Sequence, residues 1–310
     1  MNRYEPEGKL FESRENSYYI STAEGLREAA KTGKIVEARV RLCDKDRNLI
    51  VDFPCGKGII KNVDGAIGIK EGTTKPIALI TKVNKAVAFK VISVEIAEDG
   101  TVIAECSRKD AQDECMTEYV NRLSAGDVIP ARVTHMDSFG AFVDIGCGIP
   151  SLIPIAAISV SRISHPSDRF KENQDIFVVI REFKDDGKIN LSHKELLGSW
   201  EENAASFTAD ETVSGIIRSI ENYGIFIELA PNLAGLADHN PLLPASVGER
   251  ASVHIKAIIP EKMKIKLNIV SVCEDGCPMP PLRYFIKSGH IDYWKYSTDE
   301  APKIIETRFY

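Results

Sequence analysis

The chain has few aromatic residues, no long apolar run and no excess of positive charge. Aromatic residues make up 7% of its 310 residues, and no apolar stretch approaches the roughly 20 residues that cross a bilayer. Its opening segment, MNRYEPEGKLFESREN, has no apolar core of signal-peptide length. A formal net charge of −6 argues against a protein that coats DNA through charge alone. Seven scattered cysteines indicate reduced thiols, so we expect a cytoplasmic protein without membrane contact.

The sequence also lacks the motifs of common enzyme chemistry. No phosphate-binding P-loop, Gly-x-Ser-x-Gly elbow or His-Glu-x-x-His helix occurs. Cys273 and Cys277 lie four positions apart with His290 further on, but a zinc site needs four ligands in tighter pairs, and no second pair of cysteines follows. We therefore predict a protein that is not an enzyme and that holds no cofactor and no metal.

A repeat is present in the second half of the chain. Asp127–Ile145 reads DVIPARVTHMDSFGAFVDI, and Glu211–Leu229 reads ETVSGIIRSIENYGIFIEL. Both segments give an aromatic residue, a glycine, an apolar residue, a phenylalanine, an apolar residue and an acid, at 139–144 and at 223–228. An ungapped pattern of this length indicates two copies of one module.

Each copy has the pattern of a small β-barrel. Short segments of alternating apolar and polar residues are separated by turn residues, such as Gly-Cys-Gly at 146–148. Five short strands in a module of this size suit a closed barrel of the oligonucleotide-binding (OB) type, which leaves no exposed sheet edge. The predicted fold class is mainly β, with tandem five-stranded OB-fold barrels joined by short helices.

An earlier segment, 32–107, has the same outline with weaker detail. GKIVEARVRL resembles the first strand, GAIGI the third, AVAFKVISVEI the fourth and GTVIAECS the fifth. Where the other copies carry their aromatic pair, this segment reads DKDRNLIVDF, with no aromatic residue before a glycine. We predict a divergent N-terminal barrel here.

Helix caps separate the modules. Ser107 and Ser192 each begin a hydroxyl-x-x-acid pattern that caps a helix, which predicts helices over 108–123 and 193–206. The segment Ser21–Glu24 begins another helix, which ends near Gly33. The predicted order is an N-terminal segment with a short helix (1–31), the divergent barrel (32–107), a helical linker (108–123), a barrel (124–196), a linker (197–207), a barrel (208–272) and a C-terminal tail or small module (273–310).

The repeated aromatic residues are the candidate binding groups. Phe139 and Phe142 in one module, and Tyr223 and Phe226 in the next, flank a glycine that permits a bend or a close backbone approach. Exposed rings can stack on unpaired bases, at about 1–3 kcal/mol per base. A single aromatic residue on a strand is more often part of a core, but its recurrence at one repeat position favours the binding interpretation.

Nearby cations are the candidate phosphate contacts. They are Arg162, Arg169 and Lys188 in one module and Arg218, Lys264 and Lys266 in the other. The two modules hold 8 basic against 10 acidic residues (125–197) and 6 against 7 (208–272), so RNA binding would depend on stacking as well as on phosphates. Lys264 and Lys266 also fit a solvated strand face. The acids at repeated positions are interpreted as barrel-surface and turn residues: Asp137, Asp144, Glu221 and Glu228.

These residues resemble a known family. The run GDVIPARVTHMDSFGAFVDIG, then RISHPSDRF, then GKINLSHKELLGSW, is similar to the RNA-binding domain first described in ribosomal protein S1 of the bacterial small subunit. The second copy, VSGIIRSIENYGIFIELAPNLAGLA with MKIKL, is similar too, and the whole chain resembles a shorter multi-repeat form of that protein. The resemblance implies binding of single-stranded messenger RNA, without a cofactor, and association with the small ribosomal subunit.

The resemblance also assigns roles to residues. It implies that the two aromatic pairs stack on bases, and that Lys188 and Lys264 are the basic residues of the last strand. It places Arg162 and His165 in a loop where members of the family often carry basic residues. Members often have a histidine on the third strand, where this chain has Pro154 in one module and Asp238, followed by His239, in the other. The first module keeps none of the stacking residues, and the resemblance implies that 32–107 docks on the ribosome.

Three hypotheses follow from the sequence. In the first, the protein holds unstructured messenger RNA during translation initiation. In the second, the barrels have lost their RNA affinity and form a protein-binding scaffold, which the acidic balance and the third-strand departures favour. In the third, the same RNA affinity serves RNA decay or transcription.

Overall fold

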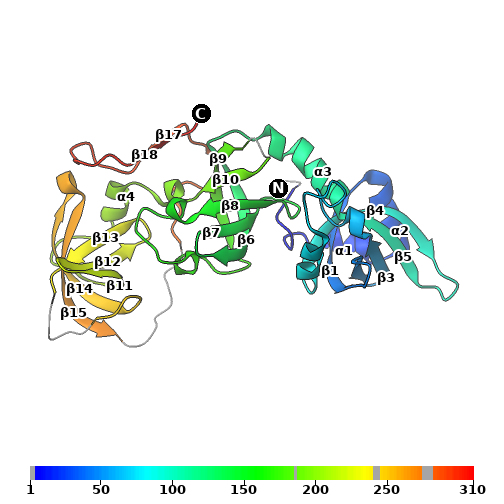
Figure 1. Ribbon diagram of the computed structural model, residues 1–310, viewed down its shortest axis with the longest axis horizontal. Coiled ribbons are helices and arrows are strands. Elements are labelled where there is room, and N and C mark those ends of the chain that lie inside the picture. The colour runs from blue at the N-terminus through cyan, green and yellow to red at the C-terminus, as the bar shows by residue number, and fades with distance from the viewer. Residues whose placement is uncertain (1–3, 185–186, 240–244, 274–281) are drawn as a thin grey trace. The chain divides into compact units, whose positions relative to one another are not determined.

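The computed structural model describes residues 4–184, 187–239, 245–273 and 282–310, and its architecture is mainly β (Figure 1). Three closed five-stranded barrels follow one another along the chain, so the predicted fold class is confirmed. The chain divides into two compact units. The first is Met1–Leu123 with Pro130–Arg132 and Asp144–Pro150, and the second is Ser124–Ile129, Val133–Val143 and Ser151–Tyr310. In these described parts, no helix combines the length and the apolar character that a bilayer crossing requires.

Barrel 1 contains the five strands of the divergent segment. They are β1 (Ile35–Cys43), β2 (Leu49–Phe53), β3 (Gly56–Ile60), β4 (Ala86–Ile96) and β5 (Val102–Ser107), in the order β1-β2-β3-β5-β4. The predicted first, fourth and fifth strands are confirmed, but the third strand is GKGII at 56–60 and not GAIGI. The two glycines of this strand break the alternation of apolar and polar residues from which strands are predicted. A Cβ at Gly58 would lie 2.6 Å from the side chain of Val51, so the missing side chain makes room for the neighbouring strand.

Helices precede and follow barrel 1. They are α1 (Arg14–Ile20), α2 (Ala23–Thr32) and α3 (Arg108–Glu118). The predicted cap of α3 is confirmed, because the Ser107 hydroxyl accepts a hydrogen bond from the Asp110 backbone N–H at 3.0 Å. Helix α2 is capped by Thr22, within the predicted starting segment Ser21–Glu24, and it ends at Gly33, as expected.

Barrels 2 and 3 repeat the strand order of barrel 1. Barrel 2 contains β6 (Asp127–Asp137), β7 (Gly140–Asp144), β8 (Pro150–Pro154), β9 (Asp175–Phe183) and β10 (Ile189–Ser192). Barrel 3 contains β11 (Thr212–Glu221), β12 (Gly224–Ala230), β13 (Leu233–Ala237), β14 (Arg250–Ile259) and β15 (Lys264–Cys273). Alternate strand residues such as Ile217, Ile225 and Val253 fill the core of barrel 3.

The predicted helix over 193–206 is divided in the structure. A 3-10 turn, η6 (Lys194–Leu197), is followed by the short helix α4 (Trp200–Ala204). Gly198, with φ of +82°, interrupts the helix. The Ser199 hydroxyl then accepts from the Glu202 N–H, and the Glu202 carboxylate accepts from the Ser199 N–H, so the effective capping box lies seven residues after Ser192.

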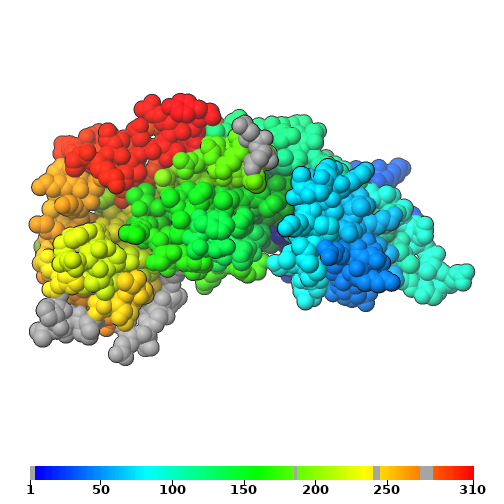
Figure 2. Space-filling model, in the orientation of Figure 1, coloured from blue at the N-terminus to red at the C-terminus, as the bar shows by residue number. Residues whose placement is uncertain are grey.

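The C-terminal tail packs on the barrels of the second unit. Its strand β16 (Gly289–His290) pairs with β6 of barrel 2, and β17 (Tyr293–Lys295) pairs with β18 (Glu306–Arg308). Ile291, Trp294 and Tyr296 are buried in one apolar cluster with residues of barrel 3, the linker and barrel 2. Figure 2 shows the red surface of the tail against this unit. The tail is therefore part of the second unit's packing.

The glycine of each aromatic repeat sits where two strands approach closely. A Cβ at Gly140 would lie 2.4 Å from the carbonyl oxygen of Ile153 on β8, and a Cβ at Gly224 would lie 2.7 Å from that of Ala237 on β13. Atoms this close would have to be separated by a displacement of the strands. The expected close backbone approach is confirmed at both positions.

We predict that Gly140→Ala lowers the free energy of unfolding by about 1–3 kcal/mol, because the added methyl group forces β7 and β8 apart. The midpoint of urea unfolding measures the effect. Ser138→Ala, in the adjacent exposed turn, is the control and should stay within about 0.5 kcal/mol of the parent. An equal midpoint for Gly140→Ala and the parent would contradict the close approach.

Candidate nucleic-acid interface

Two aromatic pairs adopt the same geometry in barrels 2 and 3. The rings of Phe139 and Phe142 are edge to face, with centroids 5.8 Å apart and planes at 89°. Those of Tyr223 and Phe226 are 6.1 Å apart at 87°. Phe139 is 51% exposed and Tyr223 is 69% exposed, while Phe142 and Phe226 are half-buried. Both pairs therefore present ring surface to solvent.

The local sequence explains this geometry. The first ring of each pair stands in the turn between the first two strands, and the second ring stands two residues beyond the glycine on the second strand. In a strand, residues two apart project to the same face. The glycine permits the close strand approach described above, and the turn ring then leans over the strand ring.

His135 extends the first pair, and sequence reasoning missed it. Its ring on β6 lies parallel to that of Phe142, with centroids 6.3 Å apart and planes at 19°. In barrel 3 the equivalent residue is Ser219, which pairs with Phe226 across the hairpin. The register of a hairpin with a two-residue turn predicts that residue 135 faces residue 142. The repeat comparison gave no signal, because only one copy has a ring there.

The predicted basic residues occupy different surroundings. Arg162 is exposed, and it lines a groove of about 400 Å³ together with Tyr223 and Phe226 of the following barrel. The Nδ1 atom of His165 accepts from the Ser167 backbone N–H at 3.2 Å, so this ring caps a short 3-10 turn. The remaining candidates are exposed, directly before β10 or on β15: Lys188, Lys264 and Lys266.

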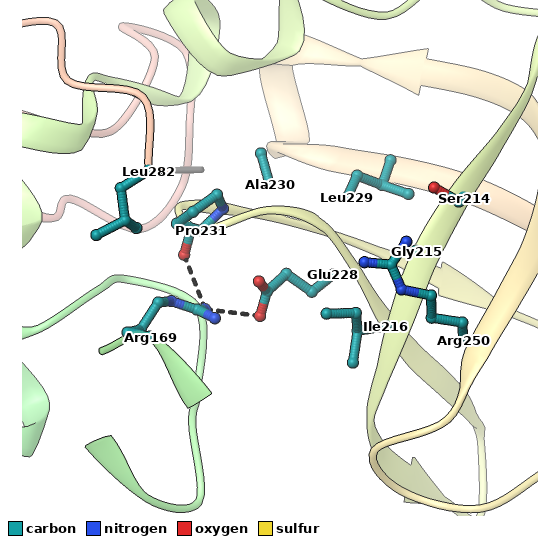
Figure 3. Close-up of a pocket in the computed structure, with 10 residues that line it drawn as sticks. All are labelled: Arg169, Ser214, Gly215, Ile216, Glu228, Leu229, Ala230, Pro231, Arg250 and Leu282. Atoms are coloured by element: carbon teal, nitrogen blue, oxygen red, sulfur yellow. Dashed lines mark hydrogen bonds and ion pairs between the residues drawn. The ribbon is translucent and has the colours of Figure 1, made fainter. Parts of the chain in front are cut away.

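Arg169 and Arg218 are not available as phosphate contacts. The Arg169 side chain is fully buried, with its Nη2 2.6 Å from an oxygen of Glu228 and 3.3 Å from the Pro231 carbonyl oxygen (Figure 3). Arg218 donates to the same Glu228 oxygen at 2.6 Å and lies 2.9 Å from Asp168. Both guanidinium groups are held by carboxylates, so the prediction that they meet RNA is wrong.

Two of the repeated acids are also buried, contrary to their interpretation as surface or turn residues. Glu228 is 5% exposed and Asp144 is 3% exposed. Asp144 accepts from the backbone N–H groups of Glu7, Gly146 and Gly148 at 2.7, 2.8 and 3.0 Å. Burial and the nearby Glu7 carboxylate raise the pKa of Asp144 to about 6. The repeat therefore has a buried acid in both copies, although its partners differ.

His193 connects barrel 2 to the tail. The ring is buried, with its Nδ1 2.8 Å from the Ile158 carbonyl oxygen and its Nε2 3.0 Å from the Tyr284 hydroxyl. Its edge-to-face contact with Phe170 has centroids 4.9 Å apart. Burial lowers the pKa of His193 to about 4, so the neutral ring is part of the folded state near neutral pH.

No metal centre is formed by the residues that the structure describes. Within them, no group of three or more histidine, cysteine, aspartate or glutamate side chains is placed to hold a metal ion. Cys277, one of the two cysteines weighed as a zinc ligand, lies outside the described residues.

Comparisons with known proteins bear on the barrels. Residues 122–194 match the family described as the S1 RNA binding domain. Small ribosomal subunit protein bS1 of Rickettsia conorii is 26% identical over 255 residues, which cover 76% of this chain and 43% of that protein. The bS1 protein of Leuconostoc lactis is 27% identical over 236 residues (70% and 54%), and the bS1 homolog of Bacillus subtilis is 27% identical over 225 residues (70% and 57%). The chain spans about half the length of these curated relatives, and the resemblance expected from the sequence is confirmed.

We predict that Glu228→Gln destabilises the second unit by about 3 kcal/mol, because it leaves two arginines with a reduced partner in a buried site. Glu221→Gln, a half-buried acid of the same barrel, is the control and should change the stability little. Thermal unfolding of the full chain measures both effects. Equal melting temperatures for the two variants would show that the buried ion pairs contribute nothing.

We predict that acidification weakens the fold through His193. The unfolded chain takes up the proton below the usual histidine pKa of about 6.5, whereas folded His193 stays neutral until about pH 4. The stability contributed by the neutral ring is therefore present above about pH 6.5 and is lost as the pH falls toward 4. Urea midpoints at pH 7, 6 and 5 should fall less steeply for His193→Gln than for His165→Gln, and parallel slopes would contradict the assignment.

Proposed function

We propose that the protein binds single-stranded RNA, messenger RNA in particular, through barrels 2 and 3. The match of residues 122–194 to the S1 RNA binding domain family and the similarity of the chain to ribosomal protein bS1 support this proposal. The observation that carries the proposal is a pair of rings, one exposed and one half-buried, set edge to face in both barrels at one repeat position. Each pair offers a ring surface to an unstacked base. Double-stranded RNA keeps its bases stacked on one another, so the proposed ligand is single-stranded.

Stacking supplies most of the affinity in this proposal. Every base has an aromatic face, so contacts with the paired rings tolerate different sequences. Barrels 2 and 3 have no excess of basic residues, and two of their arginines are committed to buried carboxylates. Phosphate contacts are left to exposed side chains: Arg162, Lys188, Lys264 and Lys266. His165 can add to them through its other ring nitrogen.

We further propose that the RNA is messenger RNA held on the small ribosomal subunit during translation initiation, in the cytoplasm. The names of the relatives describe proteins of the small ribosomal subunit, which supports this setting. Barrel 1 has no aromatic pair at the repeat position of the other two barrels, and 33–109 hold 14 basic against 10 acidic residues. We assign it to contact with the ribosome, and we assign no catalytic step to any barrel.

We predict that the double variant Phe139→Ala/Phe142→Ala binds an unstructured oligonucleotide at least tenfold more weakly, since one stacked base contributes about 1–3 kcal/mol. Tyr223→Ala/Phe226→Ala should show a similar loss. Fluorescence anisotropy with a labelled single-stranded RNA measures the affinity. Phe183→Ala removes another exposed phenylalanine of barrel 2 and is the matched control, which should bind like the parent.

Unchanged affinity in both double variants would end the stacking proposal. A salt series on the parent distinguishes RNA binding from a protein scaffold, because each phosphate that the protein neutralises steepens the fall of log affinity with log salt by about 0.7. Sedimentation with small ribosomal subunits tests the setting separately. A chain that binds RNA but does not sediment with subunits would move the proposal to RNA decay or transcription.

A further inference from the structure

The loop of barrel 2 that carries Arg162 is fixed to barrel 3. On one side of Arg162, the Val160 backbone N–H donates to the side-chain oxygen of Asn232, in the β12–β13 turn of barrel 3, at 2.9 Å. On the other side, Arg169 pairs with Glu228 at 2.6 Å and Asp168 pairs with Arg218 at 2.9 Å. The loop is thus attached at both ends to the barrel that follows it.

Asn232 joins three segments at this place. Its side-chain nitrogen donates to the carbonyl oxygens of Lys194 and Gly198, at 2.8 and 3.1 Å, in the linker between the barrels. The Tyr296 hydroxyl of the tail donates to its carbonyl oxygen. Asn232 is fully buried, so these bonds are shielded from water. These hydrogen bonds join the linker and the tail to barrel 3 without any contribution from a ligand.

A groove of about 400 Å³ lies at this junction, within the roughly 300–1,000 Å³ typical of small-ligand sites. Its walls come from barrel 2, the linker, barrel 3 and the tail, and include Arg162, Trp200, Tyr223, Phe226, Tyr296 and Ile305. Among the described residues, Arg162 forms no ion pair or hydrogen bond through its exposed guanidinium. The groove therefore combines the aromatic pair of barrel 3 with an uncommitted cation from barrel 2.

We propose that this groove is a composite site for one nucleotide, in which Tyr223 and Phe226 receive the base and Arg162 of the preceding barrel receives its phosphate. The inference rests on the proposed function. It adds that Arg162 of barrel 2 binds the same nucleotide as the aromatic pair of barrel 3. The neighbouring Arg218 cannot take that part, because Glu228 and Asp168 hold it. Barrels 2 and 3 then bind one RNA strand as a single surface, with a nucleotide position that neither barrel forms alone.

A double-mutant cycle on the full chain tests the composite site. The probe is a labelled unstructured oligoadenylate, and its affinity is measured by anisotropy for Arg162→Ala alone, with Tyr223→Ala and with Phe139→Ala. Arg162→Ala alone should weaken binding roughly tenfold and lower the salt slope by about 0.7. With Tyr223 already removed, the further loss should shrink to about twofold or less, whereas with Phe139 removed it should stay near tenfold.

Arg181→Ala is the matched control, since it removes an exposed arginine of the same barrel that lies outside the groove. It should leave the affinity and the salt slope near those of the parent. A parent protein without RNA affinity would end the proposed function itself. RNA binding that survives Arg162→Ala unchanged, or that couples Arg162 to Phe139 instead of Tyr223, would overturn the composite site and leave the proposed function standing. An equal loss in Arg181→Ala would also overturn it, in favour of diffuse charge attraction.

Discussion

Two buried carboxylates at one repeat position, Asp144 and Glu228, constrain much of the structure described above. Each belongs to the second strand of its barrel and is nearly inaccessible to water. A buried carboxylate is costly unless hydrogen bonds and opposite charges surround it. Glu228 obtains one of its partners, Arg169, from the loop of the preceding barrel, and Asp144 obtains the backbone N–H of Glu7 from the N-terminal segment. A group required by one barrel is therefore supplied by another part of the chain.

This requirement positions the aromatic face of barrel 3. Glu228 pairs with Arg169 and Arg218, and Arg218 also pairs with Asp168. These ion pairs attach the barrel 2 loop that carries Arg162 to barrel 3. Tyr223 and Phe226 both line a groove with walls from four segments. In barrel 2 the corresponding pair is accompanied by the ring of His135 instead. The two copies thus share the ring geometry and differ in what surrounds it.

The parts of the fold that depend on residues close together in the sequence could be predicted from the sequence. Alternating apolar residues predict the strands, and the repeated glycine predicts the close approach at Gly140 and Gly224. The third strand of barrel 1 was misplaced because its glycines break the alternation. The burial of Arg169 could not be foreseen, because its partner Glu228 lies 59 positions away and the pairing depends on how two barrels meet. The capping pattern at Ser192 predicted one helix over 193–206. Gly198 has a positive φ that a helix does not contain, so it interrupts that helix.

The C-terminal tail has a consequence for experiments that divide the protein at its repeat boundaries. Ile291, Trp294 and Tyr296 cover apolar side chains that belong to the linker and to barrels 2 and 3. A fragment that stops at the last barrel strand would expose this apolar surface, and such surfaces promote aggregation. The sequence repeat is thus smaller than the piece of the chain that can be isolated. A copy of the repeat that is moved into another protein would need the segment that covers its apolar surface.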